Sequence, residues 1–104
     1  MLTFNLKKEW FEKIKSGEKT HEYREVKPYW TKRLFEHYYI YGIKSCNIKD
    51  KCEFVCGYAS KDDKDKRLKA RIEYIQIVNG LNTDLKIDKN VFDIKFELIE
   101  DSNE

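Results

Sequence analysis

The sequence predicts an α+β domain: a small, mostly antiparallel β-barrel of about five or six strands with two flanking helices near the N-terminus. Helical periodicity is confined to the first 40 residues, whereas apolar/polar alternation recurs in short segments along the chain. Short consecutive strands in a chain of 104 residues tend to close into a barrel, because closure removes their edges. We expect residues 1–100 to form one domain and residues 101–104 to form a frayed tail.

The first elements follow from local pattern. Leu2–Leu6 alternates apolar and polar residues, as a half-buried strand does. Lys7–Ser16 has helical spacing, and Gly17 follows it at the place where helices commonly end in a left-handed residue. Alternation then predicts a second strand over Lys19–Glu25. The apolar face of the helix consists of Trp10, Phe11 and Ile14.

A second helix is predicted over Tyr29–Tyr38, since Pro28 suits an early helical position. Its apolar stripe has the spacing i, i+4, i+8 and consists of Trp30, Leu34 and Tyr38. Aromatic residues at this spacing usually pack in a core, so we interpret Trp30 as a packing residue.

The remainder of the chain reads as strands and polar connections. Lys51–Tyr58 and Arg67–Val78 alternate on either side of a polar turn and predict a long β-hairpin, and Val91–Ile99 predicts a last strand. Tyr39–Asp50 is ambiguous between a loop and a loop with a short strand. The predicted inward residues are Cys52, Phe54, Cys56 and Tyr58, then Leu68, Ala70, Ile72 and Tyr74, then Phe92, Ile94, Phe96 and Leu98.

Composition narrows the class of protein. Charged residues make up 38% of the chain but nearly cancel to a net charge of +2, which argues against disorder. No stretch resembles a membrane helix or a signal peptide, so we expect a cytoplasmic protein without a membrane partner. The chain has three cysteines, Cys46, Cys52 and Cys56, without paired CxxC spacing. This pattern favours buried reduced thiols over disulfides or a zinc site, and we expect no metal or cofactor.

The segment Gly17–Arg24 gathers charge just beyond the first helix. Glu22 and Arg24 are two apart on a strand and therefore project from one face, whereas Lys19 has the opposite parity unless it lies in the turn. The spacing alone fits an exposed Glu22–Arg24 ion pair of little energetic value. The alternative is a pocket that holds a base or a phosphate, with Tyr23, Tyr29 and Trp30 as stacking surfaces.

The pattern Gly17-x-Lys19-x-x-Glu22-x-Arg24 resembles the motif of the ASCH domain family, relatives of the PUA RNA-binding domains. The preceding strand and helix, the stretch Phe54-x-x-Gly57-Tyr58 and the closing strand are similar as well. The resemblance implies a PUA-like barrel and a cleft that binds RNA, another nucleic acid or a modified nucleotide. The implied ligand-binding residues are Lys19, Glu22, Tyr23, Arg24, Tyr29 and Tyr58.

Some ASCH proteins are amidohydrolases that remove acetyl from N4-acetylcytidine, and ribonuclease activity has been suggested for others. The resemblance therefore implies an alternative in which Lys19 and Glu22 are catalytic acid/base groups. Glu22 stands where those enzymes have a threonine, and their downstream glutamate has no clear counterpart, since Gly80–Asn90 offers only Asp84 and Asp88. Recognition is thus favoured over catalysis, and a protein-interaction module without a ligand is a third reading.

The two histidines have no partner at metal-ligand or catalytic-triad spacing. His21 lies inside the motif with parity opposite to Glu22 and is expected to be exposed or stacked. His37 lies off the stripe of the second helix.

Overall fold

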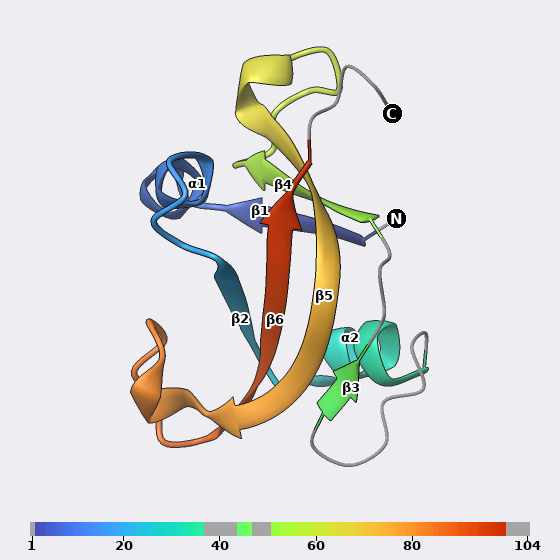
Figure 1. Cartoon of the computed structure of the whole chain (residues 1–104), viewed down its shortest axis with the longest axis vertical. Helices are drawn as coiled ribbons and strands as arrows, with labels where there is room; N and C mark the ends of the chain where they lie inside the picture. Colours follow the sequence, from blue (N-terminus) through green and yellow to red (C-terminus); the bar gives the residue numbers. More distant parts are fainter. Residues whose placement is uncertain (1, 37–43, 47–50, 100–104) are drawn as a thin grey trace.

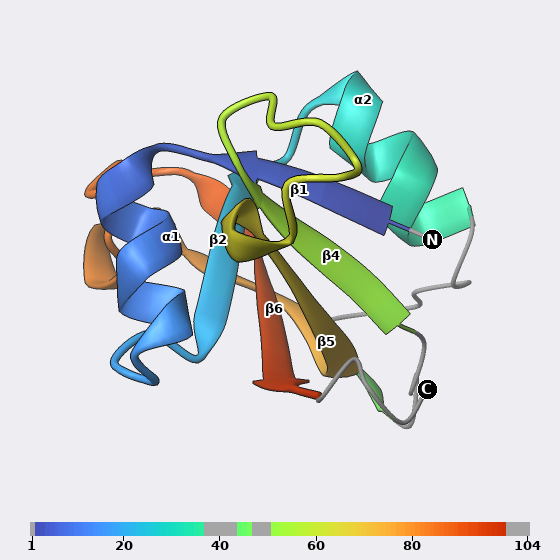
Figure 2. The same cartoon turned by 90° about the horizontal axis from the view of Figure 1, so that it is seen from above.

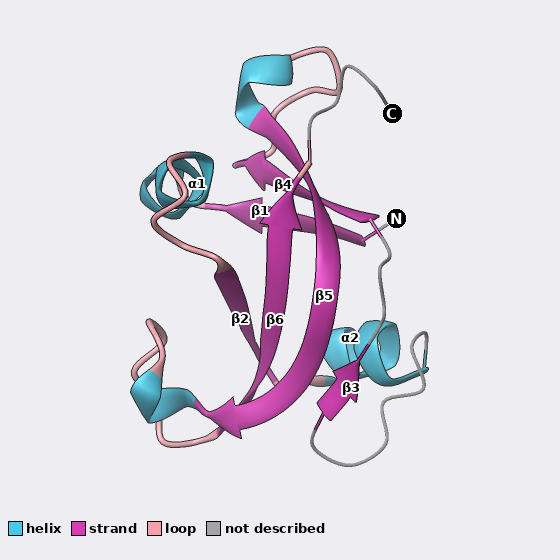
Figure 3. Cartoon of the chain, in the orientation of Figure 1, coloured by secondary structure: helices cyan, strands magenta, loops and turns pink. Residues whose placement is uncertain are grey.

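One curled, mixed β-sheet with two short helices forms the body of this α+β protein (Figure 1). The computed structural model describes residues 2–36, 44–46 and 51–99. The strands are β1 (Leu2–Leu6), β2 (His21–Glu25), β3 (Lys44–Cys46), β4 (Lys51–Cys56), β5 (Arg67–Asn79) and β6 (Asn90–Leu98). The two connections that flank β5, residues 57–66 and 80–89, lie at opposite ends of the molecule (Figure 3).

The strand order is β1-β4-β5-β6-β2, and β3 pairs with β5 off this path. β1 runs parallel to β4, and all the other pairs are antiparallel. The predicted mostly antiparallel sheet and the β4–β5 hairpin are therefore confirmed. The sheet curls as a half-barrel: β1 and β2 stand at the two ends of the order, where a closed barrel would pair them.

The first helix, α1 (Lys8–Lys15), lies close to its predicted bounds. Phe11 and Ile14 are buried, and Lys13 and Lys15 in its last turn complement the helix dipole. Gly17 follows with φ of +86°, the left-handed conformation that the sequence predicts for this position. Figure 2 shows α1 and α2 on opposite sides of the molecule, with β1 running between them.

The second helix differs from its prediction. α2 covers only Pro28–Thr31, and a π-helical turn over Lys32–Glu36 continues it. Pro28 begins α2, in agreement with its missing N–H, and the buried Leu34 holds the π-helical turn to the core. The end of the predicted helix, with His37 and Tyr38, lies outside the described residues.

An aromatic stack connects the open side of the half-barrel to its core. The Phe4 ring stacks on Trp30 at 5.1 Å and on Phe54 at 5.4 Å, and Phe54 lies 4.5 Å from Phe96. Trp30 therefore packs as predicted, although its other neighbours also give it a place in the site described below. The remaining fully buried large side chains are Phe11, Ile14, Leu34, Val55, Ile72, Ile75, Val91, Phe92 and Ile94.

A β-bulge in β5 overturns part of the predicted alternation. The register with β6 shifts between Ile72 and Tyr74, so Ile75 rather than Tyr74 follows Ile72 into the core. One extra residue reverses the parity of the strand, which strict alternation cannot anticipate. Tyr74 and Gln76 consequently lie on the outer face of the sheet, opposite Lys95 and Asp93.

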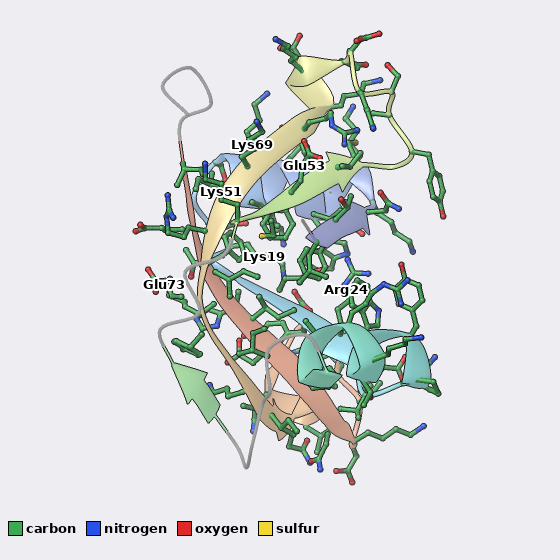
Figure 4. The ribbon with its side chains drawn as sticks, turned by 90° about the vertical axis from the view of Figure 1, so that its right-hand side faces the viewer. Lys19, Arg24, Lys51, Glu53, Lys69 and Glu73 are labelled. Carbon is green, nitrogen blue, oxygen red and sulfur yellow. The ribbon has the colours of Figure 1, made fainter. Side chains whose placement is uncertain are left out.

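Two further predicted inward residues are exposed. Leu98 lies at the end of β6 and is 38% exposed. Tyr58 is 92% exposed, because β4 ends at Cys56 and Gly57, with φ of +63°, turns the chain away. Charged side chains from β4 and β5, including Lys51, Glu53, Lys69 and Glu73, lie along these strands in Figure 4.

The described cysteine thiols are free. Cys52 is fully buried, and burial raises its pKa to about 12, with smaller contributions from the carboxylates of Glu22 and Glu53. Its thiol is therefore protonated at neutral pH, in line with the predicted reduced, buried cysteine. Cys56 is half-buried. No helix within the described residues has the length and apolar character needed to cross a membrane.

Candidate functional site

The turn between α1 and β2 determines where Lys19 lies. The backbone N–H of Gly17 donates to the Ile14 carbonyl at 3.1 Å, and that of Lys19 donates to the Lys13 carbonyl at 3.0 Å. Lys19 thus closes the helix and lies before β2, which begins at His21. The parity of the strand does not apply to it, and its side chain turns to the same side as Glu22.

Lys19 is buried among charges of opposite sign. Only 9% of its side chain is exposed, and its Nζ contacts the Asp84 carboxylate and lies 3.6 Å from Glu22 Oε1. The rings of Trp10 and Tyr23 lie beneath the ammonium, with their centroids 5.3 and 5.1 Å from Nζ. Two carboxylates and two aromatic faces therefore hold one cation.

Arg24 joins the two end strands of the half-barrel. Its Nε and Nη2 lie 2.9 and 2.6 Å from Glu22 Oε2, and its Nη2 donates to the Asn5 carbonyl of β1 at 3.2 Å. The guanidinium also lies over the rings of Phe4 and Trp30, at 5.3 and 5.0 Å. Arg24 lies near α2 in Figure 4. The Arg24 side chain thus connects β2 to β1, the two strands at opposite ends of the strand order.

Glu22 projects from the core face of β2. It pairs in register with the buried Ile94 and is itself 5% exposed. Burial raises the pKa of its carboxyl, whereas Arg24 and Lys19 oppose this shift. Oε1 lies 3.6 Å from the Lys19 ammonium, which is too long for a hydrogen bond. This oxygen can therefore accept a hydrogen bond from a ligand.

These residues line one cleft of about 310 Å³, a volume within the range of small-ligand pockets. We call it the motif cleft. Its lining includes three charged motif residues and three aromatic rings: Lys19, Glu22, Arg24, Trp10, Tyr23 and Trp30. The structure thus brings the two predicted cations and the carboxylate together, and it places Tyr23 beside them.

The other two tyrosines that the resemblance implies lie elsewhere. Tyr29 is 55% exposed, packs edge-on against Trp30 at 4.9 Å and lies under the Arg33 guanidinium. Tyr58 lies in the turn after β4. Neither residue lines the motif cleft.

Two residues that line the motif cleft are not among the binding residues predicted from the sequence, although Asp84 was one of the two acidic residues noted in Gly80–Asn90. Asp84 lies 65 residues from Lys19 in a polar loop, and no local spacing connects them. Trp10 belongs to the predicted apolar face of α1, but it is only partly buried and its ring faces Lys19. With Asp84 included, the buried cluster holds two cations and two carboxylates and carries no net charge.

A second cleft, of about 500 Å³, adjoins the first and shares Trp10, Lys19, Tyr23 and Asp84 with it. We call it the His21 cleft. His21 Nδ1 lies 2.6 Å from Asp93 Oδ1, and Gln76 Nε2 donates to Asp93 Oδ2 at 2.7 Å. No local spacing indicates this partner, since Asp93 is 72 residues away from His21. The imidazole stacks parallel to Tyr23, as expected for an exposed or stacked histidine.

Within residues 2–36, 44–46 and 51–99, no group of three or more His, Cys, Asp or Glu side chains is arranged to hold a metal ion. The described side chains of this site offer hydrogen bonds, ion pairs, aromatic stacking and proton transfer. Comparisons of the chain with protein-family models, curated proteins and solved structures found no match.

Proposed function

We propose that this protein is an ASCH-like domain of the PUA-like type that binds RNA or a nucleotide by taking one base into the motif cleft. The observation that carries the proposal is Glu22 Oε1, which lies 3.6 Å from the Lys19 ammonium, too far for a hydrogen bond, at a cleft lined by aromatic rings. Flat aromatic walls suit a base of any kind, and a carboxylate selects one with an exocyclic amine.

The charges of the cleft favour a base over a phosphate as its occupant. Lys19 and Arg24 are already paired with Asp84 and Glu22, so neither buried cation is available to hold a dianion. The exposed Lys27, which also lines the cleft, lies 3.3 Å from Glu25. A cytosine or adenine amine can donate to Glu22, whereas the O4 carbonyl of uracil would face a carboxylate oxygen.

Nucleoside binding tests the proposal directly. We expect cytidine and adenosine to shift the indole N–H signals of Trp10 and Trp30 in NMR spectra, because these are the two tryptophans of the chain and both line the cleft. Uridine should bind about tenfold more weakly. For RNA and single-stranded DNA at low salt, Arg24→Ala should weaken binding, and Arg33→Ala, an exposed arginine outside the cleft, serves as its control. An absence of indole shifts with every nucleoside and oligonucleotide contradicts the proposal.

The contact between Asp84 and Lys19 favours a second candidate, a hydrolase of an acylated nucleoside. In that reaction Glu22, whose pKa is raised by burial, takes a proton from water as the water oxygen adds to the acyl carbon. Lys19 then gives a proton to the amine nitrogen as the C–N bond breaks, and Asp84 holds the ammonium in place. We expect N4-acetylcytidine to yield cytidine and acetate in a chromatographic assay if this candidate holds. Turnover no faster than that of Lys19→Ala rejects it.

A further inference from the structure

We infer that His21, oriented by Asp93, is a pH-dependent contact for a phosphodiester, and that the two adjoining clefts together bind a nucleic-acid strand. This inference rests on the proposed function, because it places the phosphate next to the base in the motif cleft. His21 occupies a variable position of the motif pattern, so the resemblance implies no role for it.

The Asp93 carboxylate fixes which nitrogen of His21 is available. A carboxylate only accepts hydrogen bonds, so the imidazole Nδ1 carries the proton and donates to Asp93 Oδ1. Asp93 is 4% exposed, and Gln76 holds its second oxygen, which fixes the carboxylate in position. Nε2 is left for a ligand, and the side chain of His21, 30% exposed, lines the His21 cleft.

The position of this histidine beside the motif cleft suits a phosphate. Lys19, Tyr23 and Asp84 line both clefts, so a base in the motif cleft has the His21 cleft as its neighbour. The His21 cleft offers exposed cations that are at most loosely paired: Lys13 Nζ is as far as 3.9 Å from Glu18 Oε2, and the exposed Lys86 also lines the cleft. Cations around a groove next to a base site are the usual arrangement for single strands.

Protonation determines whether Nε2 can hold a phosphate oxygen. In the neutral imidazole Nε2 only accepts hydrogen bonds, whereas in the imidazolium it donates one to the anion. Histidine is the side chain that ordinarily changes charge between pH 5 and 8. The other titratable or charged groups that face His21 or line its cleft are Asp93 and Lys95 of β6, Tyr74 of β5, Tyr23 of β2, and Lys13, Glu18, Lys19, Asp84 and Lys86.

The experiment compares the dissociation constants of cytidine and of the dinucleotide CpC at about pH 6 and about pH 8, at one salt concentration. CpC is a phosphodiester and keeps its charge over this range. The ratio of the two constants also cancels any titration of Glu22, which acts on both ligands. We expect CpC to bind about fivefold more tightly than cytidine at pH 6 and about equally at pH 8.

Two variants identify the titrating group. His21→Gln should bring the ratio to about one at both pH values, and His21→Lys, which is charged at both, should give a raised ratio that does not depend on pH. A ratio that still rises at low pH in either variant overturns the inference. If His21→Gln does not fold, the His21→Lys profile decides alone.

The outcomes separate this inference from the proposed function. If cytidine binds and the dissociation constants of cytidine and CpC are equal at pH 6, the phosphodiester contact is rejected and base recognition is left intact. Binding of neither ligand rejects both. Dimethyl phosphate, which carries the phosphodiester without a nucleoside, should not bind at the same concentration. Binding as strong as that of CpC would identify a site for free anions and overturn the inference of a joint strand site.

Discussion

Replacing Lys19 by methionine is expected to lower the free energy of unfolding by about 3 kcal/mol at pH 7. Methionine preserves the packing on Trp10 and Tyr23, but it leaves the carboxylates of Glu22 and Asp84 close together without the ammonium between them. Removing one partner from a buried ion cluster costs far more than the cluster contributes in net terms, because the remaining charges stay desolvated. Urea unfolding followed by tryptophan fluorescence measures the change.

The loss should depend on pH in a defined direction. Without the ammonium, which opposes the shift, the pKa of the Glu22 carboxyl in the folded variant rises further above its unfolded value. A raised folded-state pKa means that stability is retained at low pH and lost as pH rises through that value. The difference between the wild type and Lys19→Met should therefore shrink as the pH falls toward about 4, where the Glu22 carboxyl becomes protonated.

Lys13→Met is the matched control, because Lys13 also lies over the Trp10 ring and near a carboxylate. Its side chain is 48% exposed and its partner Glu18 is 3.9 Å away, so we expect a change within about 0.5 kcal/mol. The double variant Lys19→Met/Glu22→Gln should recover part of the loss. Equal stability of Lys19→Met and Lys13→Met would show that the cluster is not buried in the way the structure describes.

Most of the fold could be predicted because its signals are local. β1 lies at its predicted bounds, α1 lies within its predicted range, and Gly17 has the predicted positive φ. The β4–β5 hairpin follows from alternation on either side of a polar turn. The parallel pairing of β1 with β4 could not be predicted, since the two strands lie some 50 residues apart and alternation does not specify the partner of a strand.

In the candidate site, too, the local features could be predicted and the partners distant in sequence could not. The motif predicted that Lys19, Glu22 and Arg24 line one site, and they line one cleft in the structure. Lys19 can face this cleft despite its opposite strand parity because it lies in the turn before β2. Asp84 and Asp93 could not be predicted, because each meets its partner through strand pairing or loop placement over 65 residues or more. The bulge in β5 could not be predicted from the sequence either, although it places Gln76 on the face where it contacts Asp93.

Replacing Glu22 by glutamine is expected to abolish the preference for cytidine over uridine without lowering stability at neutral pH. Since burial raises the pKa of Glu22, the ionised carboxylate is less favourable in the folded state than in the unfolded chain. Glutamine resembles the protonated form, so the variant should be at least as stable as the wild type above the unfolded-state pKa. As pH falls toward 4, the wild type gains a proton at Glu22 and the difference should disappear.

The binding change follows from the groups at the end of the side chain. A carboxylate accepts from the cytosine amine only, whereas an amide can also donate to the uracil carbonyl. The preference of about tenfold should therefore fall to about one, as measured by NMR titration of both nucleosides. Lys19 keeps Asp84 as its partner in this variant, and Arg24 keeps the Asn5 carbonyl.

Glu53→Gln is the control that distinguishes a structural role of Glu22 from a role in ligand binding. Glu53 is 9% exposed, and each of its two oxygens accepts a hydrogen bond from Arg67, at 3.0 and 2.6 Å. A glutamine there would point its NH₂ group at an arginine donor and should reduce stability, whereas both Arg24 contacts are with one oxygen of Glu22, which glutamine can supply. If a carboxylate has a structural role, its replacement by glutamine lowers stability, as expected at Glu53. If it binds a ligand, the replacement leaves stability unchanged or higher and removes selectivity. If Glu22→Gln destabilises the protein as Glu53→Gln does and leaves the cytidine preference intact, Glu22 and Arg24 are a structural ion pair. Because stability and selectivity are expected to change independently at Glu22, the pair of measurements separates the two roles.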